Sequence, residues 1–188
     1  MKIYYCDGST RGGKNQKGAD NVGGWGAVCF SDELENNICA CEYDTENNTT
    51  NNRQELKALL YCLNHADEFY PDEKCIIYSD SAYVVNTFNT WIHSWAANGW
   101  KNSKKQTVEN LDLILDLWEF AQKEFYNVTV QKTTGHCGEV GNELADALAT
   151  ASMNKFSRII EENNISIYWD ELDTFESIRE LNHVFKNF

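Results

Sequence analysis

The chain has 188 residues, of which 42% are hydrophobic and 13% aromatic. This length and composition suffice for one folded domain with an appendage, and they exclude a largely disordered chain. The net charge of −13 argues against a uniformly basic surface, which phosphate binding would need. Positive charge is concentrated locally, in residues 11–18 and 101–105, whereas residues 32–46 carry acidic residues and no Lys or Arg.

The N-terminal residues lack the apolar run of a secretory signal, and no uncharged apolar stretch approaches the roughly 18 residues of a membrane helix. The 7 cysteines are odd in number and include no Cys-x-x-Cys pair. We therefore expect a cytoplasmic protein without a membrane segment. Its cysteines are expected to be reduced thiols in the core, and neither zinc ligands nor disulfides.

The hydrophobic patterns predict an α/β domain. Apolar runs at residues 2–6, 24–30 and 37–43 indicate an antiparallel meander of strands. Helical periodicity from Arg53, followed by a buried strand at 74–79, indicates a crossover that places this strand parallel to the first one. The remaining predicted elements are helices at 81–97 and 111–122, a strand at 127–132 and a helix at about 140–153.

Residues 154–188 form a predicted extension. It contains a β-prone piece, residues 165–169, and an amphipathic helix with Asp170 as its N-cap. An apolar stripe runs along that helix, formed by Phe175, Ile178, Leu181, Phe185 and Phe188. Because such a stripe must be covered, residues 170–188 either dock on the domain or bind a protein partner, and docking is the expectation.

Two aspartates, Asp7 and Asp80, end predicted strands. If those strands are parallel neighbours, the two carboxylates emerge side by side at the edge where open α/β sheets bind ligands. Each residue alone is equally typical of a plain turn, in which Asp and Gly are common.

Glu55 lies near the start of a predicted helix and has two interpretations. Asn52 and Glu55 are spaced as a capping pair, in which the glutamate reaches back to the backbone of the cap. Glu55 also shares a helical face with Leu59 and Cys62, which turns its carboxylate toward the sheet, where an unpaired charge is costly. A bound metal ion would compensate that charge.

Asp146 lies in the last predicted helix of the domain, where a lone acidic residue is as often solvated as functional. His136 precedes it in a loop between Gly135 and Gly138, a setting that suits a proton shuttle as well as a surface histidine. With the other three acidic positions, Asp146 completes a set that can hold two divalent cations roughly 3.5–4 Å apart, the apparatus of phosphodiester hydrolysis.

Aromatic and basic residues are interleaved after the second predicted helix. They are Trp91, Trp95, Trp100, Lys101, Lys104 and Lys105. Because tryptophan is usually well buried, at least one of the three is expected in the core. The lysines belong either to a binding loop or to a solvated turn.

These motifs, in this order, resemble type 1 ribonuclease H over roughly residues 2–153. The matching segments are Asp7-Gly8-Ser9, Gly23-Gly24-Trp25-Gly26-Ala27, residues 49–56, Ser79-Asp80-Ser81, residues 91–95, Gly99-Trp100-Lys101, Gly135-His136-Cys137-Gly138 and residues 142–146. The resemblance implies a ribonuclease H-like fold, with a five-stranded mixed sheet of three antiparallel and then parallel strands, flanked by helices. It implies a catalytic domain at 1–153, acting as a monomer that cleaves the RNA strand of RNA–DNA hybrids internally. The ends left would be a 5′-phosphate and a 3′-hydroxyl.

The resemblance also assigns roles to residues. Asp7, Glu55, Asp80 and Asp146 match carboxylates that bind two Mg²⁺ ions, for which Mn²⁺ can substitute, and His136 matches a loop histidine that assists product departure. The residues that match substrate contacts are Thr50, Asn51, Asn52, Gln54, Trp91, Trp95, Trp100, Lys101, Lys104 and Lys105. In the family, the segment matching residues 50–54 grips a DNA phosphate and reads the RNA minor groove, and the tryptophan handle contacts the DNA sugar–phosphate chain.

The chain departs from the family pattern in two places. Residues 11–22 are longer and more polar than the usual loop, so either Asn15 or Asn21 takes over a phosphate contact. The handle has Ala-Ala-Asn at 96–98 where more basic examples carry cations, which predicts weaker binding and a shallower salt dependence. Two other functions stay open on sequence alone: a non-catalytic binding module of the same fold, and a nuclease that acts on DNA only.

Overall fold

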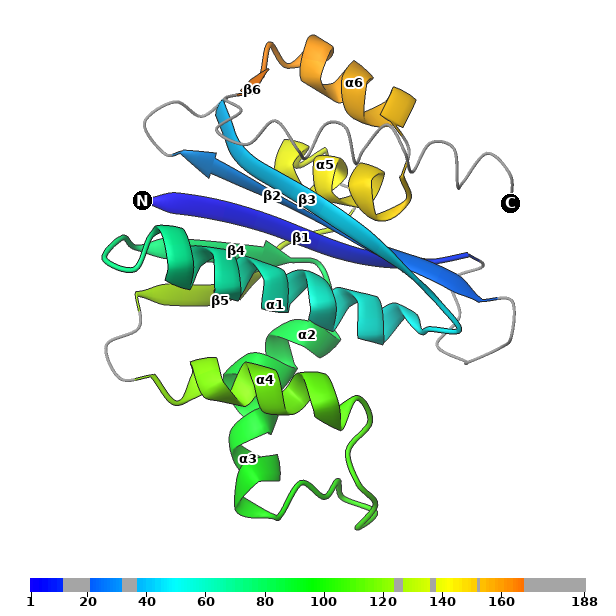
Figure 1. The fold of residues 1–188 in the computed structure, drawn as a ribbon, viewed down its shortest axis with the longest axis vertical. Helices are drawn as coiled ribbons and strands as arrows, with labels where there is room; N and C mark the ends of the chain where they lie inside the picture. The colour runs from blue at the N-terminus through cyan, green and yellow to red at the C-terminus, as the bar shows by residue number, and fades with distance from the viewer. Residues whose placement is uncertain (12–20, 32–36, 124–126, 136–137, 152, 168–188) are drawn as a thin grey trace.

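A mixed sheet forms the centre of the structure, a computed structural model, and helices cover both of its faces (Figure 1). The residues described are 1–11, 21–31, 37–123, 127–135, 138–151 and 153–167. Among them, no helix is both long and apolar enough to cross a membrane.

The sheet begins with three antiparallel strands, β1 (Lys2–Thr10), β2 (Val22–Ser31) and β3 (Asn37–Asn47). Strand β4 (Cys75–Ser79) pairs in parallel with β1, and β5 (Val128–Lys132) pairs in parallel with β4. The predicted mixed sheet is therefore confirmed. The β-prone piece of the extension contributes a short additional strand, β6 (Ser166–Ile167), which lies parallel to β3 and gives the order β5-β4-β1-β2-β3-β6.

Two hydrophobic cores lie on opposite faces of this sheet. Helix α1 (Asn51–Phe69) covers one face, where Tyr4 and Cys6 of β1 are buried with it. Helix α5 (Val140–Ala149) covers the other face, against which Ile3 and Tyr5 pack. The alternation of β1 side chains between the two cores follows from the two-residue period of a strand.

Both covering helices approach the sheet closely at glycines. A Cβ atom added at Gly8 would lie 2.2 Å from the backbone nitrogen of Glu55, and one added at Gly26 would lie 2.5 Å from the carbonyl oxygen of Ala145. A larger residue at either position would push a helix away from the sheet. These contacts bring the start of α1 and the middle of α5 against the centre of β1 and β2.

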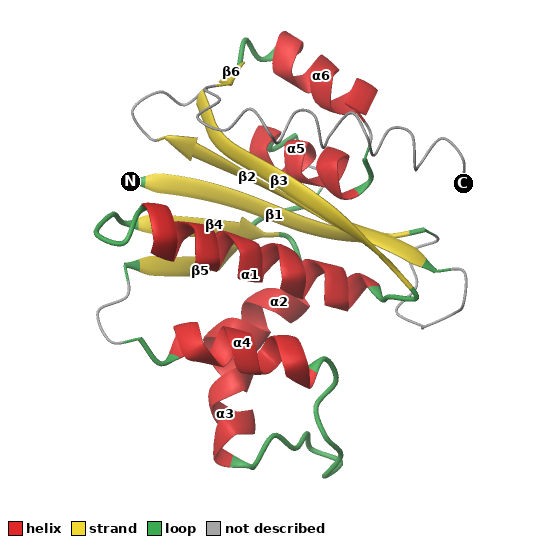
Figure 2. Ribbon diagram, in the orientation of Figure 1, coloured by secondary structure: helices red, strands yellow, loops and turns green. Residues whose placement is uncertain are grey.

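A helical lobe follows β4 and projects from the edge of the sheet near β5 (Figure 2). It consists of α2 (Ala82–Asn86), η1 (Thr87–Trp91), α3 (Ile92–Ala97) and α4 (Leu111–Ala121). The first three form the continuous helix predicted over 81–97, but η1 is a π-helical turn, a feature that often accompanies functional sites. Ile92 and Ile114 bury the lobe against the α1 core.

The predicted helix at 140–153 is too long, because α5 ends at Ala149. Ala151 has a φ of 48°, in the left-handed region that interrupts a helix, and the Thr150 hydroxyl donates to the carbonyl of Asp146 at 2.8 Å. A separate helix, α6 (Met153–Glu162), then begins and was not predicted. Its Phe156 and Ile159 are buried in the α5 core, whereas the helix predicted after Asp170 lies outside the described residues.

Candidate active site

The acidic residues singled out in the sequence come from four different elements. Asp7 lies within β1, Glu55 in the first turns of α1, Asp80 directly after β4 and Asp146 in α5. They are close enough that the charges of the other three all act on Asp7. The fold therefore brings together residues that are far apart in the chain.

Asp7 does not end its strand, contrary to the prediction. Strand β1 continues to Thr10 because its last residues pair with β2. The parallel ladder with β4, however, stops where Tyr5 lies opposite Tyr78, so Asp7 lies just beyond it. The predicted neighbourhood of Asp7 and Asp80 is correct although the strand boundary is wrong.

Asp7 is the most perturbed of these carboxyl groups. Its side chain is 9% exposed, and burial, followed by the charges of Asp80, Asp146 and Glu55, raises its pKa to about 8. A backbone hydrogen bond from Gly8 opposes the shift. The site therefore surrounds a buried carboxyl group with other acidic groups.

Glu55 is buried beside this group. Burial raises its pKa to about 7; the Ser81 hydroxyl and the Asn51 amide oppose this shift, and the Asp80 charge adds to it. The Asn51 amide donates to Glu55 Oε1 at 2.6 Å, whereas Oε2 is buried and has no hydrogen-bond partner within the described residues. An orphaned carboxylate oxygen at this position is suited to a cation.

Asp80 is held between α5 and the loop that follows β5. The Asn142 amide donates to Asp80 Oδ2 at 3.4 Å, and a Cβ atom added at Gly135 would lie 2.5 Å from the same oxygen. The backbone nitrogen of Thr133 donates to the Ser79 carbonyl at 3.0 Å, which fixes the start of this loop beside Asp80. His136 comes next in the chain but lies outside the described residues.

Asp146 is paired with a lysine of α6 that sequence reasoning missed. Lys155 Nζ contacts Asp146 Oδ2 and lies 3.2 Å from Glu143 Oε2. Although burial opposes it, these two carboxylates raise the pKa of Lys155 above its ordinary value. The contact depends on the end of α5 at Thr150 and Ala151, which no periodicity in the sequence reveals.

The donor set fits divalent cations that prefer oxygen ligands. The fit rests on the orphaned Glu55 oxygen and on the mutual repulsion that raises the pKa of Asp7. Within the described part of the chain, no three His, Cys, Asp or Glu side chains form a ready-made metal-binding group. Cation binding would therefore have to draw the carboxylates closer together, and it would compete with the ion pair between Lys155 and Asp146.

The first turn of α1 carries several predicted substrate contacts. Thr50 is the N-cap, and its hydroxyl accepts from the Arg53 backbone nitrogen at 3.3 Å, so the alternative of an Asn52 cap is wrong. Asn51 and Asn52 are half-buried in this turn. Gln54 is fully buried instead, and its amide donates to Thr49 at 2.8 Å and to Glu46 at 2.7 Å.

Asn21, one of the two asparagines considered for a phosphate contact, is tied to the same region. Its amide donates to the Thr49 carbonyl at 2.8 Å, and the Thr49 backbone nitrogen donates back to Asn21 at 3.2 Å. Asn15 lies outside the described residues.

The predicted handle lies in the helical lobe. Trp91 is 38% exposed, and its ring centroid is 5.9 Å from that of Trp95. Trp100 packs edge-on against Trp118 at 5.9 Å and joins the margin of the α1 core, as expected for at least one tryptophan. Trp95, Lys101 and Lys105 line a cavity of about 680 Å³ together with Ser94, Asn98, Asn102 and Ser103, while Lys104 is exposed nearby.

Tyr83 extends this handle and was missed by sequence reasoning. Its ring centroid is 6.1 Å from that of Trp91. Burial raises the pKa of its hydroxyl group. Tyr83, Trp91 and Trp95 therefore form a row of aromatic rings that ends at the lysine-lined cavity.

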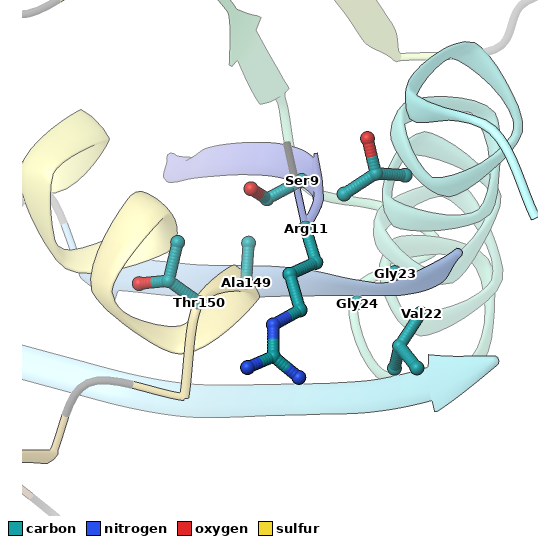
Figure 3. Close-up of a pocket in the computed structure, with 8 residues that line it drawn as sticks. Ser9, Arg11, Val22, Gly23, Gly24, Ala149 and Thr150 are labelled. Atoms are coloured by element: carbon teal, nitrogen blue, oxygen red, sulfur yellow. The ribbon is translucent and has the colours of Figure 1, made fainter. Parts of the chain in front are cut away.

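A second cavity opens at the end of β1 that follows Asp7 (Figure 3). It has a volume of about 280 Å³ and lies between the end of β1, the start of β2 and the end of α5. Ser9 lines it and shares the strand face of Asp7, and the Arg11 side chain extends across it.

Known proteins resemble this chain in sequence and in structure. The RNase H family model matches residues 1–154. Ribonucleases H of Francisella tularensis subsp. novicida and Francisella philomiragia are each 39% identical over 153 residues, which cover 80% of this chain and 90% of each relative.

Two solved structures share the fold. The crystal structure of LC9-RNase H1, a type 1 RNase H with the type 2 active-site motif, matches with a TM-score of 0.68 at 22% identity, over 89% of this chain and 86% of that one. The solution structure of the PFV RNase H domain matches with a TM-score of 0.65 at 25% identity, over 79% of this chain and 92% of that one. From its sequence relatives and its fold, the chain belongs to the RNase H family, whose members are ribonucleases that cleave RNA in RNA–DNA hybrids.

Proposed function

We propose that this protein hydrolyses the RNA strand of RNA–DNA hybrids internally, using two divalent cations, and leaves 5′-phosphate and 3′-hydroxyl ends. The observation that carries the proposal is the buried Asp7 carboxyl group, whose pKa is raised to about 8 by burial and by three neighbouring acids. Such like-charge crowding destabilises the folded protein, and it is typical of functional sites. Cation binding would relieve it.

Asp7, Glu55, Asp80 and Asp146 would hold the cations, with Mg²⁺ preferred and Mn²⁺ as a substitute, because all four offer carboxylate oxygens. When bound, the cations would supply an activated water and stabilise the leaving oxygen. The free Oε2 atom of Glu55 is the oxygen we expect to become a ligand.

Neighbouring amides would keep these carboxylates oriented. Asn51 donates to Glu55 Oε1 at 2.6 Å, and Asn142 donates to Asp80 Oδ2 at 3.4 Å. Each amide fixes one oxygen of its partner and leaves the other to face a ligand. We assign product departure to His136, because the loop that carries it starts beside Asp80.

The aromatic row would hold the DNA strand of the hybrid. Exposed Trp91 offers an apolar face for a deoxyribose, and Lys101 and Lys105 at the far cavity offer charge to phosphates. Asn51 and Asn52, close to the carboxylates, would contact the RNA strand and its 2′-hydroxyl groups. LC11-RNase H1 and the foamy viral protease-reverse transcriptase, which share the fold at 19% and 20% identity, have been solved with an RNA/DNA hybrid.

A nuclease assay tests the proposal directly. The protein would be incubated with a labelled RNA–DNA hybrid, double-stranded RNA or double-stranded DNA, in Mg²⁺ and in EDTA. We expect cleavage of the hybrid RNA alone, in Mg²⁺ alone. Cleavage of DNA would favour the DNA-specific alternative, and no cleavage of any substrate would favour the binding module.

Asp7→Asn and Asp116→Asn form a matched pair of variants for the same assay. Both remove one negative charge, but Asp116 is exposed on α4. We expect Asp7→Asn to lose nearly all hybrid cleavage and Asp116→Asn to keep it. Retention of activity within a few fold by Asp7→Asn would refute the metal assignment.

A further inference from the structure

Two cysteines approach each other closely in the sheet, at a place that the nuclease site does not use. Cys39 Sγ lies 3.2 Å from Cys29 Sγ, and its thiol donates to the backbone carbonyl of Cys29 at 3.3 Å. Both residues are free thiols, as are the other cysteines within the described residues. The separation of the two sulfur atoms is shorter than an ordinary packing contact and longer than the roughly 2.05 Å of a disulfide.

A β-bulge creates this pair. Cys29 lies opposite Ala40 and Phe30 lies opposite Ile38, so Cys39 is an extra residue in β3. In a regular strand Cys39 would face the same side as Cys41, which is buried in the α5 core. The bulge instead turns Cys39 to the α1 side, where Cys29 is buried.

The surroundings of the pair favour a thiolate at Cys39. The Cys29 thiol, which is within hydrogen-bond distance, lowers the pKa of Cys39 to about 6 although burial opposes the shift, and the charge of Lys2 and the Tyr70 hydroxyl contribute. Lys2 Nζ lies 4.4 Å from the centroid of the Tyr70 ring, so both groups are gathered at this end of the sheet. The pKa of Cys41, in contrast, is shifted upward, because burial raises it to about 12.

Accessibility also distinguishes the two members of the pair. Cys39 is half-buried, whereas Cys29 is 1% exposed. A small reagent can therefore reach the sulfur of Cys39 first, and Cys29 can react only with what is already attached there.

We propose that Cys39 is a nucleophilic thiol that small disulfides modify, and that Cys29 is its resolving partner. The Cys39 thiolate attacks one sulfur of glutathione disulfide, forms a mixed disulfide and releases one glutathione thiolate. The released glutathione thiolate takes the proton of Cys29, and the resulting Cys29 thiolate attacks the Cys39 sulfur, which releases the second glutathione. The net reaction converts two protein thiols and one glutathione disulfide into one protein disulfide and two molecules of glutathione.

The site is separate from the proposed nuclease chemistry. Cys29 pairs with Tyr4, which precedes Asp7 by roughly 10 Å of strand. The two cysteines lie on the α1 side, whereas Asp7 follows Ile3 and Tyr5 on the α5 side. Modification of these cysteines therefore does not depend on whether the protein is a nuclease.

Peptide mapping of the full chain after exposure to glutathione disulfide tests the proposal. Trypsin has no cleavage site between Cys29 and Cys41, but a Glu-specific protease can cut after Glu33, Glu35 and Glu42. We expect the peptide with Cys29 to be joined to the one with Cys39 under non-reducing conditions. With limited iodoacetamide at about pH 7, Cys39 should be alkylated about tenfold faster than Cys41.

Single variants assign each role, and a neighbouring cysteine serves as the control. Cys29→Ala should stop the reaction at a glutathione adduct on Cys39, and Cys39→Ala should leave Cys29 unmodified. Cys41→Ala should keep the cross-link. Equal alkylation of Cys39 and Cys41, or a cross-link that Cys41→Ala abolishes, would overturn the proposal; so would full oxidation of the parent protein without a bond between Cys29 and Cys39.

Discussion

Removal of the Asp7 charge should stabilise the metal-free protein while it abolishes catalysis. Asp7 has an ordinary pKa of 3.8 and a folded-state pKa of about 8. Because the folded-state pKa is the higher one, ionisation of Asp7 opposes folding. The penalty is absent below about pH 4, grows as the pH rises and levels off above about pH 8.

The size of the effect follows from the shift in pKa. Each pKa unit corresponds to about 1.4 kcal/mol, so the penalty at pH 7 has a ceiling of roughly 4 kcal/mol. Asparagine keeps a buried polar group at the position, and we expect about half of this ceiling as a gain for Asp7→Asn. For a chain of this size, that gain raises Tm by roughly 4–8 °C.

Thermal melts in EDTA, followed by circular dichroism, would measure this gain. The difference in Tm between Asp7→Asn and the parent should be small at about pH 4 and largest at about pH 8. The Asp116→Asn variant should melt like the parent at both values. If Asp7→Asn melted at or below the parent temperature throughout, the picture of a strained acidic cluster would be wrong.

Three further variants probe the surroundings of the site. Lys155→Met should lower the free energy of unfolding in EDTA by about 1–2 kcal/mol, because it leaves Asp146 and Glu143 without their lysine partner. It should also strengthen Mn²⁺ binding several-fold in a substrate-free titration. An unchanged Mn²⁺ affinity would show that Lys155 does not compete with the metal ion for Asp146. Trp91→Ala should raise KM for the hybrid about tenfold, or about 1.4 kcal/mol, with little change in kcat, whereas exposed Leu115→Ala should change neither. Phe156→Ala should cost about 3–5 kcal/mol in denaturant unfolding, because the side chain is 2% exposed in the α5 core; a negligible cost would mean that α6 adds little to stability.

The sequence was sufficient for the order of the strands and for singling out four acidic residues that the fold brings near one another. Each strand shows its apolar run locally, and each acid stands beside a recognisable boundary or helical face, so no long-range information was needed. Even the parallel arrangement of β1 and β4 followed from the helix between them, since crossover connections of this kind have one preferred form.

Other features depended on how distant segments meet. Gln54 lies in the same motif as Asn51, yet it is buried because Glu46 and Thr49 offer it partners. The N-cap of α1 is Thr50, whose backbone is extended, because Asn52 already lies inside the helix that begins at Asn51.

The sequence by itself therefore determined the five main strands, the helix that covers each face of the sheet and the acids that gather near β1 and β4. Only the tertiary structure decided that Lys155 reaches Asp146 and that Cys39 faces Cys29 and not the side of Cys41. The contact of Lys155 depends on the left-handed backbone conformation of Ala151, and the position of Cys39 depends on a one-residue bulge in β3. In both cases one local departure from regular backbone structure changes the direction of a side chain. Packing against distant elements stabilises that departure, and hydrophobic periodicity in the sequence does not encode such packing.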